Sequence, residues 1–315
     1  MSDIYLQQSL FDVESFSAQI TNDDLFDSAE LREYSFDHCW QYQIRLQNLA
    51  DDIKEAQLTD KEIASLTVKD FEFAPLITRY ERINATRFIQ KHEWLGNLSQ
   101  YTTHWFGAYY KNILAGVILL NMPNSFSKML GEDTPKMERL ISRGACISWS
   151  PKNLASSFIM WVTRWMVKNT DYRLFTAYSD PMAKELGTVY QACNFYYLGQ
   201  SAGTTERYIN PYTGKIVSDR FFRQRSAYKK YCAELGIQWR RDWDNGTGMN
   251  WHNIPQNVEA LLREKSKLVQ NASQKISVPS KHKYALVLGA TKKETKELKK
   301  LFIARNNVYA YPKDR

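Results

Sequence analysis

A strand, a turn and a helix follow one another between Leu140 and Trp161, and this run constrains the fold more than any other part of the chain. In its first part, alternate residues on one face are Ile141, Arg143, Ala145 and Ile147, which is the period of a β-strand. A polar turn follows at residues 150–153. Large apolar side chains then recur at helical spacing, at Leu154, Phe158, Trp161, Val162 and Trp165. The sequence therefore predicts a strand that leads directly into a packed helix.

The start of this helix is a predicted binding site for an anion. Its first N–H groups have no intrahelical acceptor, and they suit a pyrophosphate or a carboxylate. We expect an anionic ligand to be bound there by Ser148, Asn153, Ala155, Ser156 and Ser157. An ordinary hydrogen bond at the helix start is the alternative explanation for Ser156. Arg143 shares a face with aliphatic residues, so it requires an anionic partner, either Asp180 or a group of a ligand.

The flanking segments extend the strand–helix pattern. Residues 101–110 and 113–121 have the composition of a β-hairpin, and residues 173–178 and 195–199 that of two more strands, with a short helix at residues 183–193 between them. The resulting order is hairpin, strand, helix, strand, helix, strand. It predicts an α/β (α+β) fold in which helices flank a mixed sheet with a right-handed crossover.

This order resembles the GNAT acyltransferase fold. In that fold the turn between the fourth strand and its helix holds the pyrophosphate of acetyl-CoA, and a tyrosine on the next helix often faces the thioester as a general acid. Tyr190, with the aromatic Phe195 after it, matches the second feature. The first feature departs from the family, because residues 150–157 contain no glycine. The resemblance implies that acetyl-CoA is the acyl donor. For Tyr190, the alternative explanation is that its side chain belongs to the hydrophobic core.

A narrower resemblance is to the Mom family of bacteriophage DNA-modification proteins, over residues 76–205. Its functional residues match Arg143, Ser156, Asp180 and Tyr190 in order and approximate spacing. Mom proteins are GNAT-like and convert adenine in DNA to an N6-substituted, methylcarbamoyl-type base, which blocks restriction enzymes. The resemblance implies that Arg143 positions an anionic group, Ser156 binds the donor, and Tyr190 acts as an acid or orienting donor. Asp180 would accept a proton or hold a metal, although Asp before Pro is also an ordinary turn former.

His92 is a further candidate for the site. Mom-like proteins carry a His–aromatic element near this point, and here Glu93 separates His92 from Trp94. Imidazole and carboxylate groups suit non-haem iron. His92 and Asp180, together with a third group, are therefore candidate iron ligands, and a site without a metal ion is the alternative.

Charge divides the chain into three parts. Residues 1–75 contain 5 Lys/Arg and 16 Asp/Glu, whereas residues 206–315 contain 23 Lys/Arg and 10 Asp/Glu. We predict an acidic helical N-terminal arm (1–75), a GNAT-like catalytic body (76–205) and a basic C-terminal extension (206–315). The basic charge indicates double-stranded DNA as the partner, and the arm would either engage a protein partner or mask the basic surface. A basic protein without a nucleic-acid partner is the alternative.

The basic extension contains the predicted DNA contacts, which are Arg220, Arg223, Arg225, Lys229, Lys230, Arg240 and Arg241. Most lie on a helix expected at residues 219–235. Trp239, Trp243 and Trp251 alternate with cations, as in surfaces that stack an unpaired base. A solvated helix and a small satellite core are the alternative explanations.

Together these features predict a phage-type DNA modification enzyme that acts on adenine N6 in the host-cell cytoplasm. No apolar run approaches the ~18 residues of a membrane span, the N-terminus lacks a signal-peptide pattern, and the four cysteines are scattered. Two other functions fit the same sequence. One is an acetyl-CoA-dependent N-acetyltransferase, and the other is a non-catalytic, GNAT-derived DNA-binding protein.

Overall fold

The computed structural model describes residues 39–98, 101–123, 127–203, 205–214, 216–244 and 248–313. The chain forms two compact units. The body comprises residues 34–203 and 279–315, and the inserted unit, residues 204–278, interrupts it. Residues 1–38, which include half of the predicted acidic arm, lie outside the described residues. Within the described ranges, no helix is both long and apolar enough to cross a membrane.

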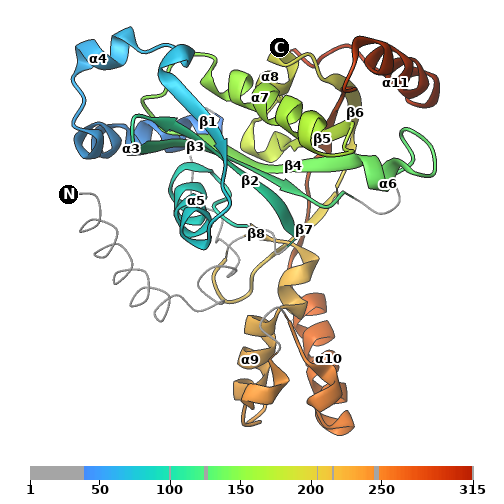
Figure 1. Ribbon diagram of the computed structural model, residues 1–315. Coiled ribbons are helices and arrows are strands. Elements are labelled where there is room, and N and C mark those ends of the chain that lie inside the picture. Colours follow the sequence, from blue (N-terminus) through green and yellow to red (C-terminus); the bar gives the residue numbers. More distant parts are fainter. Residues whose placement is uncertain are drawn as a thin grey trace. The chain divides into compact units, whose positions relative to one another are not determined.

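A seven-stranded sheet in the order β1-β2-β3-β4-β5-β10-β6 forms the centre of the body (Figure 1). Its strands are β1 (Phe71–Pro75), β2 (Thr102–Tyr110), β3 (Ile113–Asn121), β4 (Glu138–Cys146), β5 (Leu174–Ser179), β6 (Tyr196–Ala202) and β10 (Lys281–Val287). All neighbours are antiparallel except β4 and β5, which are parallel. The predicted α/β class and the predicted mixed sheet are confirmed.

Helices cover both faces of this sheet. They are α3 (Trp40–Ala56), α4 (Asp60–Ser65), α5 (Arg79–His92), α6 (Thr134–Met137), α7 (Leu154–Asn169), α8 (Thr188–Ala192) and α11 (Lys292–Arg305). Along β3, Ile118 and Leu120 belong to the core beneath α7, whereas Val117 and Leu119 belong to the core beneath α5. Figure 1 accordingly shows α5 and α7 on opposite sides of the sheet.

A β-bulge at Ser142 overturns the predicted alternation along β4. Leu119 of β3 pairs with Arg143 and Leu120 pairs with Ile141, so Ser142 is the extra residue. The Ser142 hydroxyl donates to Leu119 O at 3.1 Å. Because one extra residue reverses every later side chain, Ile141 lies in the core beneath α7 and Ala145 in the core beneath α5. Arg143 therefore does not share a face with Ile141.

The predicted boundary at residue 75 is wrong, because part of the acidic arm completes the body. β1 pairs with β2 from Phe71 to Pro75. Trp40 and Ile44 of α3 are buried, and the Trp40 ring contacts Trp94 edge-on at 5.2 Å. These apolar side chains fold onto the body despite the acidic composition of the segment, since burial depends on one face of a helix and not on its net charge.

The predicted basic extension also divides differently. β10 lies between β5 and β6, and α11 packs Phe302 against the core that contains Ala285 and Val287. Residues 279–315 therefore belong to the body. Strand propensity alone does not specify which strands are the partners of β10.

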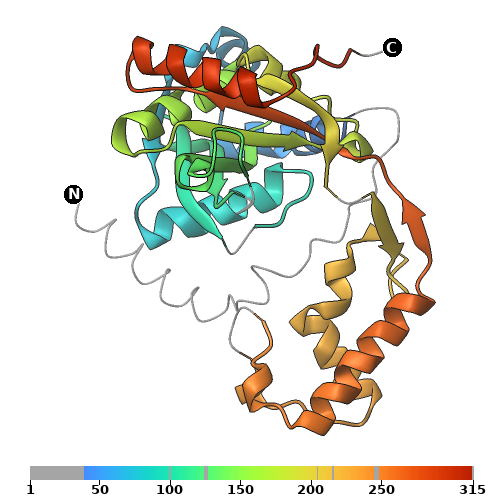
Figure 2. The same cartoon turned by 90° about the vertical axis from the view of Figure 1, so that its right-hand side faces the viewer.

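The inserted unit, residues 204–278, has its own small sheet and core (Figure 2). Its elements are β7 (Glu206–Ile209), β8 (Ile216–Val217), β9 (Lys275–Ser277), η3 (Asp219–Arg223), α9 (Arg225–Glu234), η4 (Arg241–Trp243), η5 (Trp251–Asn253) and α10 (Gln256–Ala272). The sheet order is β8-β7-β9. The predicted helix at residues 219–235 is in fact a 3-10 helix followed by α9, because the backbone is extended at Gln224 (φ −78°, ψ 156°).

Candidate active site

β4 and β5 part at the middle of the sheet. They pair only from Glu138 to Ile141 and from Leu174 to Ala177, although β4 continues to Cys146 and β5 to Ser179. The bulge at Ser142 lies at the point where they separate. Parallel strands that diverge leave backbone groups without a partner strand, and bulges next to functional sites redirect side chains. The polar side chains beyond this point form the candidate active site.

Arg143 is the first of these side chains, and its partners come from the C-terminal end of α5. Its Nε donates to Asn97 O at 2.7 Å and lies 4.0 Å from Glu93 Oε2. The Glu93 carboxylate also accepts from Gly96 N at 2.6 Å. Glu93 is buried, and burial raises its pKa while Arg143 and the backbone N–H groups oppose the rise. Of the two partners expected for Arg143, Asp180 or a group of a ligand, Asp180 is not the one that it contacts, because the bulge directs Arg143 toward the residues that follow α5.

Asp180 pairs instead with Lys281. Its Oδ2 lies 2.8 Å from Lys281 Nζ at the start of β10, and its Oδ1 accepts from Met182 N at 3.0 Å. The second contact is the ordinary turn that an Asp-Pro sequence makes. Lys281 lies 101 residues farther along the chain, so the strand order of the sheet brings the two together. No pattern in the sequence singles out Lys281 as a partner of Asp180.

Glu185 joins this group from the loop after β5. Its backbone N–H donates to Asp180 O at 3.2 Å, and its Oε2 accepts from Asp180 N at 3.4 Å. Burial and repulsion from Glu93 raise its pKa to about 7, and Asp180 adds to that repulsion. A carboxyl group with this pKa exchanges a proton near neutral pH, which suits a general base.

Replacing Glu185 with glutamine is expected to stabilise the protein at pH 8. The raised pKa means that the folded state holds a proton between about pH 4.5 and 7 that the unfolded state releases. Stability therefore falls as pH rises through this window, by on the order of 2–3 kcal/mol, and glutamine removes the fall. Urea unfolding from pH 5 to 8 measures this difference. Glu72→Gln, at an exposed position of β1, is the control and should leave the pH dependence unchanged.

Tyr190 lies on α8 against the aromatic core. Its ring contacts Phe195 at 5.4 Å and Tyr284 at 5.5 Å. Burial raises its pKa, and the nearby Glu185 raises it further, so the phenol keeps its proton. Within the described residues its hydroxyl makes no hydrogen bond. Tyr190 thus packs against the core, as the alternative explanation held, and among the described residues its protonated hydroxyl has no hydrogen-bond partner.

Gly187 fixes the start of α8 and with it the position of Tyr190. Its φ is +68°, and an added Cβ would overlap the ring of Tyr284. Gly187→Ala is therefore expected to lower the free energy of unfolding by ~2–4 kcal/mol, from backbone strain plus overpacking. Gly203→Ala is the matched control in the same unit, because its φ is +83° but its Cβ would meet only the side chain of Lys281, at 3.5 Å or more. Urea unfolding of both variants separates strain from overlap, and equal losses would refute the overlap.

At the strand–helix junction, the side chains make local hydrogen bonds. Ser156 Oγ donates to Asn153 O at 3.1 Å, the alternative stated for this residue. Ser148 Oγ donates to the buried Asp52 of α3 at 2.6 Å. Ala155 is exposed, and Asn153 has the left-handed conformation with φ 71°. The first-turn amides of α7 have no intrahelical acceptor. Donor binding by Ser148, Asn153, Ala155, Ser156 and Ser157 stays a prediction.

His92 does not join Asp180. Its Nδ1 lies 3.6 Å from Asp52 Oδ2, and its ring contacts Phe88 at 4.3 Å. Burial lowers its pKa to about 4, against the effect of Asp52. Among the residues that the structure describes, no group of three His, Cys, Asp or Glu side chains could hold a metal ion. The predicted iron site at His92 and Asp180 is not supported.

Most of the predicted DNA contacts in the inserted unit already have acidic partners. Arg225 lies 2.7 Å from Asp244, Arg240 lies 2.9 Å from Asp242, Arg223 pairs with Asp219, and Lys229 lies 4.0 Å from Asp244. Lys230 lies over the Tyr212 ring. Arg220 and Arg241 are exposed. Trp239, Trp243 and Trp251 belong to the core of the unit, which is the alternative explanation given for them.

The chain matches the Mom protein family over residues 75–313. No curated protein matches it. Among solved structures, an N-acetyltransferase from Staphylococcus aureus Mu50 is 15% identical, covering 46% of this chain and 92% of its own, with a TM-score of 0.32. A GNAT family acetyltransferase from Elizabethkingia anophelis, solved with acetyl-CoA bound, is 11% identical and covers 70% of this chain and 99% of its own, with a TM-score of 0.31. With TM-scores below 0.5, the fold assignment depends on the strand order of the sheet.

Proposed function

Because the chain belongs to the Mom protein family, we propose that it is a GNAT-fold transferase that adds an N6 substituent, of methylcarbamoyl type, to adenine in double-stranded DNA. The observation that carries the proposal is the group of Arg143, Glu185 and Tyr190 where β4 and β5 part. It combines a cation, a proton acceptor and a proton donor beside an open strand edge. Protection of the DNA against restriction enzymes follows from the modified base.

The side chains at this site support a transfer of the substituent to adenine N6 in which a named residue accepts the proton that the N6 amine loses. The N6 amine of adenine is a weak nucleophile, since its lone pair is delocalised into the ring. Glu185 accepts the proton that N6 loses as its bond to the donor carbon forms. Tyr190 donates a proton to the leaving group as the bond between that group and the donor carbon breaks. Asp180, neutralised by Lys281 at 2.8 Å, holds the loop that carries Glu185.

The donor that fits best is a CoA thioester whose acyl group is itself the substituent transferred to N6, since acetyl-CoA would give N6-acetyladenine. Its diphosphate would be held by the N–H groups of Ala155 and Ser156 in the first turn of α7, where short side chains leave them accessible, whereas Ser157 N already donates to Asn153 O at 3.0 Å. Such a donor supplies an activated carbon with a thiolate leaving group. Arg143 would orient a polar group of the donor, because its guanidinium is held by Asn97 and Glu93 at the edge of the site.

Mass spectrometry of nucleosides from the DNA of expressing cells tests the proposal. We expect a deoxyadenosine derivative of increased mass, and we expect that plasmid DNA from the same cells resists restriction enzymes with adenine in their sites. Unmodified adenine together with acetylated protein or small amines would show instead an N-acetyltransferase. Calorimetric titration of the purified protein with acetyl-CoA tests the donor separately.

A further inference from the structure

The body carries a hollow at the end of the sheet opposite to the candidate active site. It has a volume of about 710 Å³ and lies where β5 begins and β10 ends, lined by Arg164, Lys168, Asp171, Arg173 and the segment from Leu288 to Ala290. β5 has six residues, so the hollow and the active site are roughly 20 Å apart along that strand.

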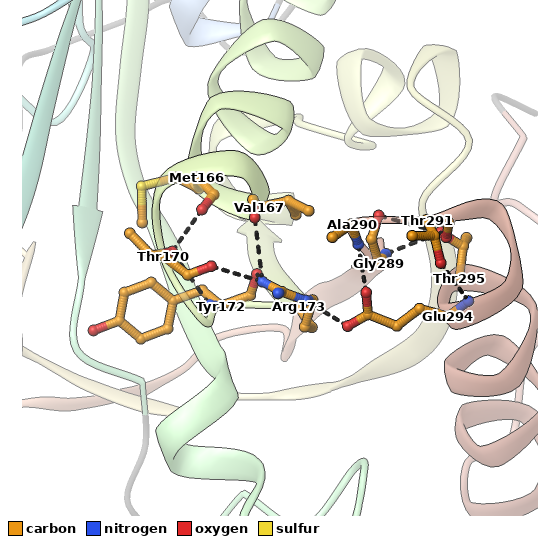
Figure 3. Close-up of polar contacts among 10 residues, drawn as sticks. All are labelled: Met166, Val167, Thr170, Tyr172, Arg173, Gly289, Ala290, Thr291, Glu294 and Thr295. Carbon is orange, nitrogen blue, oxygen red and sulfur yellow. Dashed lines mark hydrogen bonds and ion pairs between the residues drawn. The ribbon is translucent and has the colours of Figure 1, made fainter.

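Arg173, which lines the hollow, pairs with Glu294 of α11 (Figure 3). Arg173 Nε donates to Glu294 Oε1 at 2.7 Å, and its Nη1 donates to Thr170 O at 2.7 Å. The other oxygen of Glu294 accepts from Ala290 N at 2.6 Å. The opposite charges of Arg173 and Glu294 therefore cancel, and their hydrogen bonds connect the N-terminus of α11 to the C-terminal end of α7. Arg164 and Lys168, one helical turn apart on α7, are exposed and have no acidic partner in the described ranges.

α11 continues this basic surface. Five lysines on it make no ion pair in the part of the chain that the structure describes: Lys292, Lys293, Lys296, Lys299 and Lys300. At ~100° per residue they fall within one arc of about 120°, opposite Leu298 and Phe302, which pack on the sheet. Of the two glutamates on the helix, Glu294 is bonded to Arg173 and Glu297 lies outside the arc.

A merely solvated helix face does not account for this pattern. Soluble surfaces usually intersperse both signs, because a field of one sign repels itself. The rise from Lys292 to Lys300 is about 12 Å. A DNA duplex carries roughly seven phosphate charges over that length. The lysine stripe thus has the length and charge density to follow one stretch of a phosphate backbone.

We propose that α11 and the C-terminal end of α7 bind the phosphate backbone of duplex DNA. The inference rests on the proposed function, in which DNA is the substrate. It assigns to the body a DNA-binding surface of its own, separate from the basic residues of the inserted unit. The surface contributes to affinity and leaves the chemistry to Arg143, Glu185 and Tyr190.

The test is a full-length triple variant, Lys292→Gln, Lys296→Gln and Lys300→Gln, titrated with a labelled 20-base-pair duplex at several salt concentrations. The slope of log K against log salt should become shallower by about 2–3, since each lost phosphate contact removes ~0.9. The Michaelis constant for DNA should rise at least ~10-fold while kcat stays within about twofold. The corresponding Lys→Arg triple should behave like the parent.

Two further variants make the test specific. The control is a second triple variant that removes the same charge from exposed positions elsewhere on the body: Lys61→Gln, Lys69→Gln and Lys111→Gln. Its slope of log K against log salt should equal that of the parent. If both triple variants change the slope equally, the effect is one of net charge, and α11 is not a specific DNA-binding surface. Arg220→Gln with Arg241→Gln probes the inserted unit. If the parent protein modifies DNA and the α11 triple variant binds DNA as the parent does, this inference alone is refuted. If the parent protein neither binds nor modifies DNA, the proposed function is refuted as well.

Discussion

Arg143→Ala is expected to lower the fraction of modified adenine at least ~100-fold while the protein stays folded. The guanidinium is the only cation within 4 Å of the buried Glu93 carboxylate among the described ion pairs. In the proposed function its removal deletes the group that would orient the donor, and loss of one preorganised charged contact at a reacting centre typically costs 10²–10³ in rate. Nucleoside mass spectrometry gives the modified fraction, and circular dichroism the melting temperature.

Two companion variants decide what the loss means. Arg143→Lys keeps the charge but loses the planar guanidinium that reaches Asn97, so it should recover only part of the activity. Tyr190→Phe removes one oxygen and preserves the contacts with Phe195 and Tyr284, so its stability should be unchanged while its rate falls. Full modification in both the Arg143→Ala and the Tyr190→Phe proteins would place the chemistry elsewhere.

The sequence predicts those parts of the fold that depend on local pattern. The β2–β3 hairpin, the strand before α7 and the order of the following elements were all predicted, because apolar period and turn residues are local signals. The bulge at Ser142 was not, since it is defined by the register with β3 and leaves no mark in the residues of β4 alone. This one residue changed the expected partner of Arg143.

The candidate site was predicted in part for the same reason. Arg143, Asp180 and Tyr190 stand out as polar residues in apolar elements, and the structure brings them to the same end of the sheet. Glu93, Glu185 and Lys281 were missed, because their importance comes from burial and from contacts across the sheet. One pattern in the sequence could have identified Glu185: two carboxylates, Asp180 and Glu185, lie on either side of the turn at Pro181.

Deletion of residues 1–75 is expected to abolish cooperative unfolding of the body. It removes β1, which pairs with β2, and it removes the buried Trp40, Ile44 and Phe71. Each buried side chain of this size contributes ~1.5–3 kcal/mol. The deletion also removes Asp52, whose carboxylate lies 2.9 Å from Lys91 and accepts from Ser148 at 2.6 Å. The total loss is comparable to the ~5–15 kcal/mol stability of a whole domain.

A shorter deletion, of residues 1–38, is the control for this prediction. It retains α3 and β1, so the transition should persist, and removing nine acidic residues and one arginine should raise the affinity for duplex DNA if the segment masks a basic surface. Hydrogen exchange of the β2 and β3 amides reports on the body independently of the inserted unit, which has its own core. Protection of these amides in the 1–75 deletion would show that α3 and β1 are accessory. Loss of protection only in the longer deletion would place the N-terminal limit of the catalytic fold between residues 39 and 75.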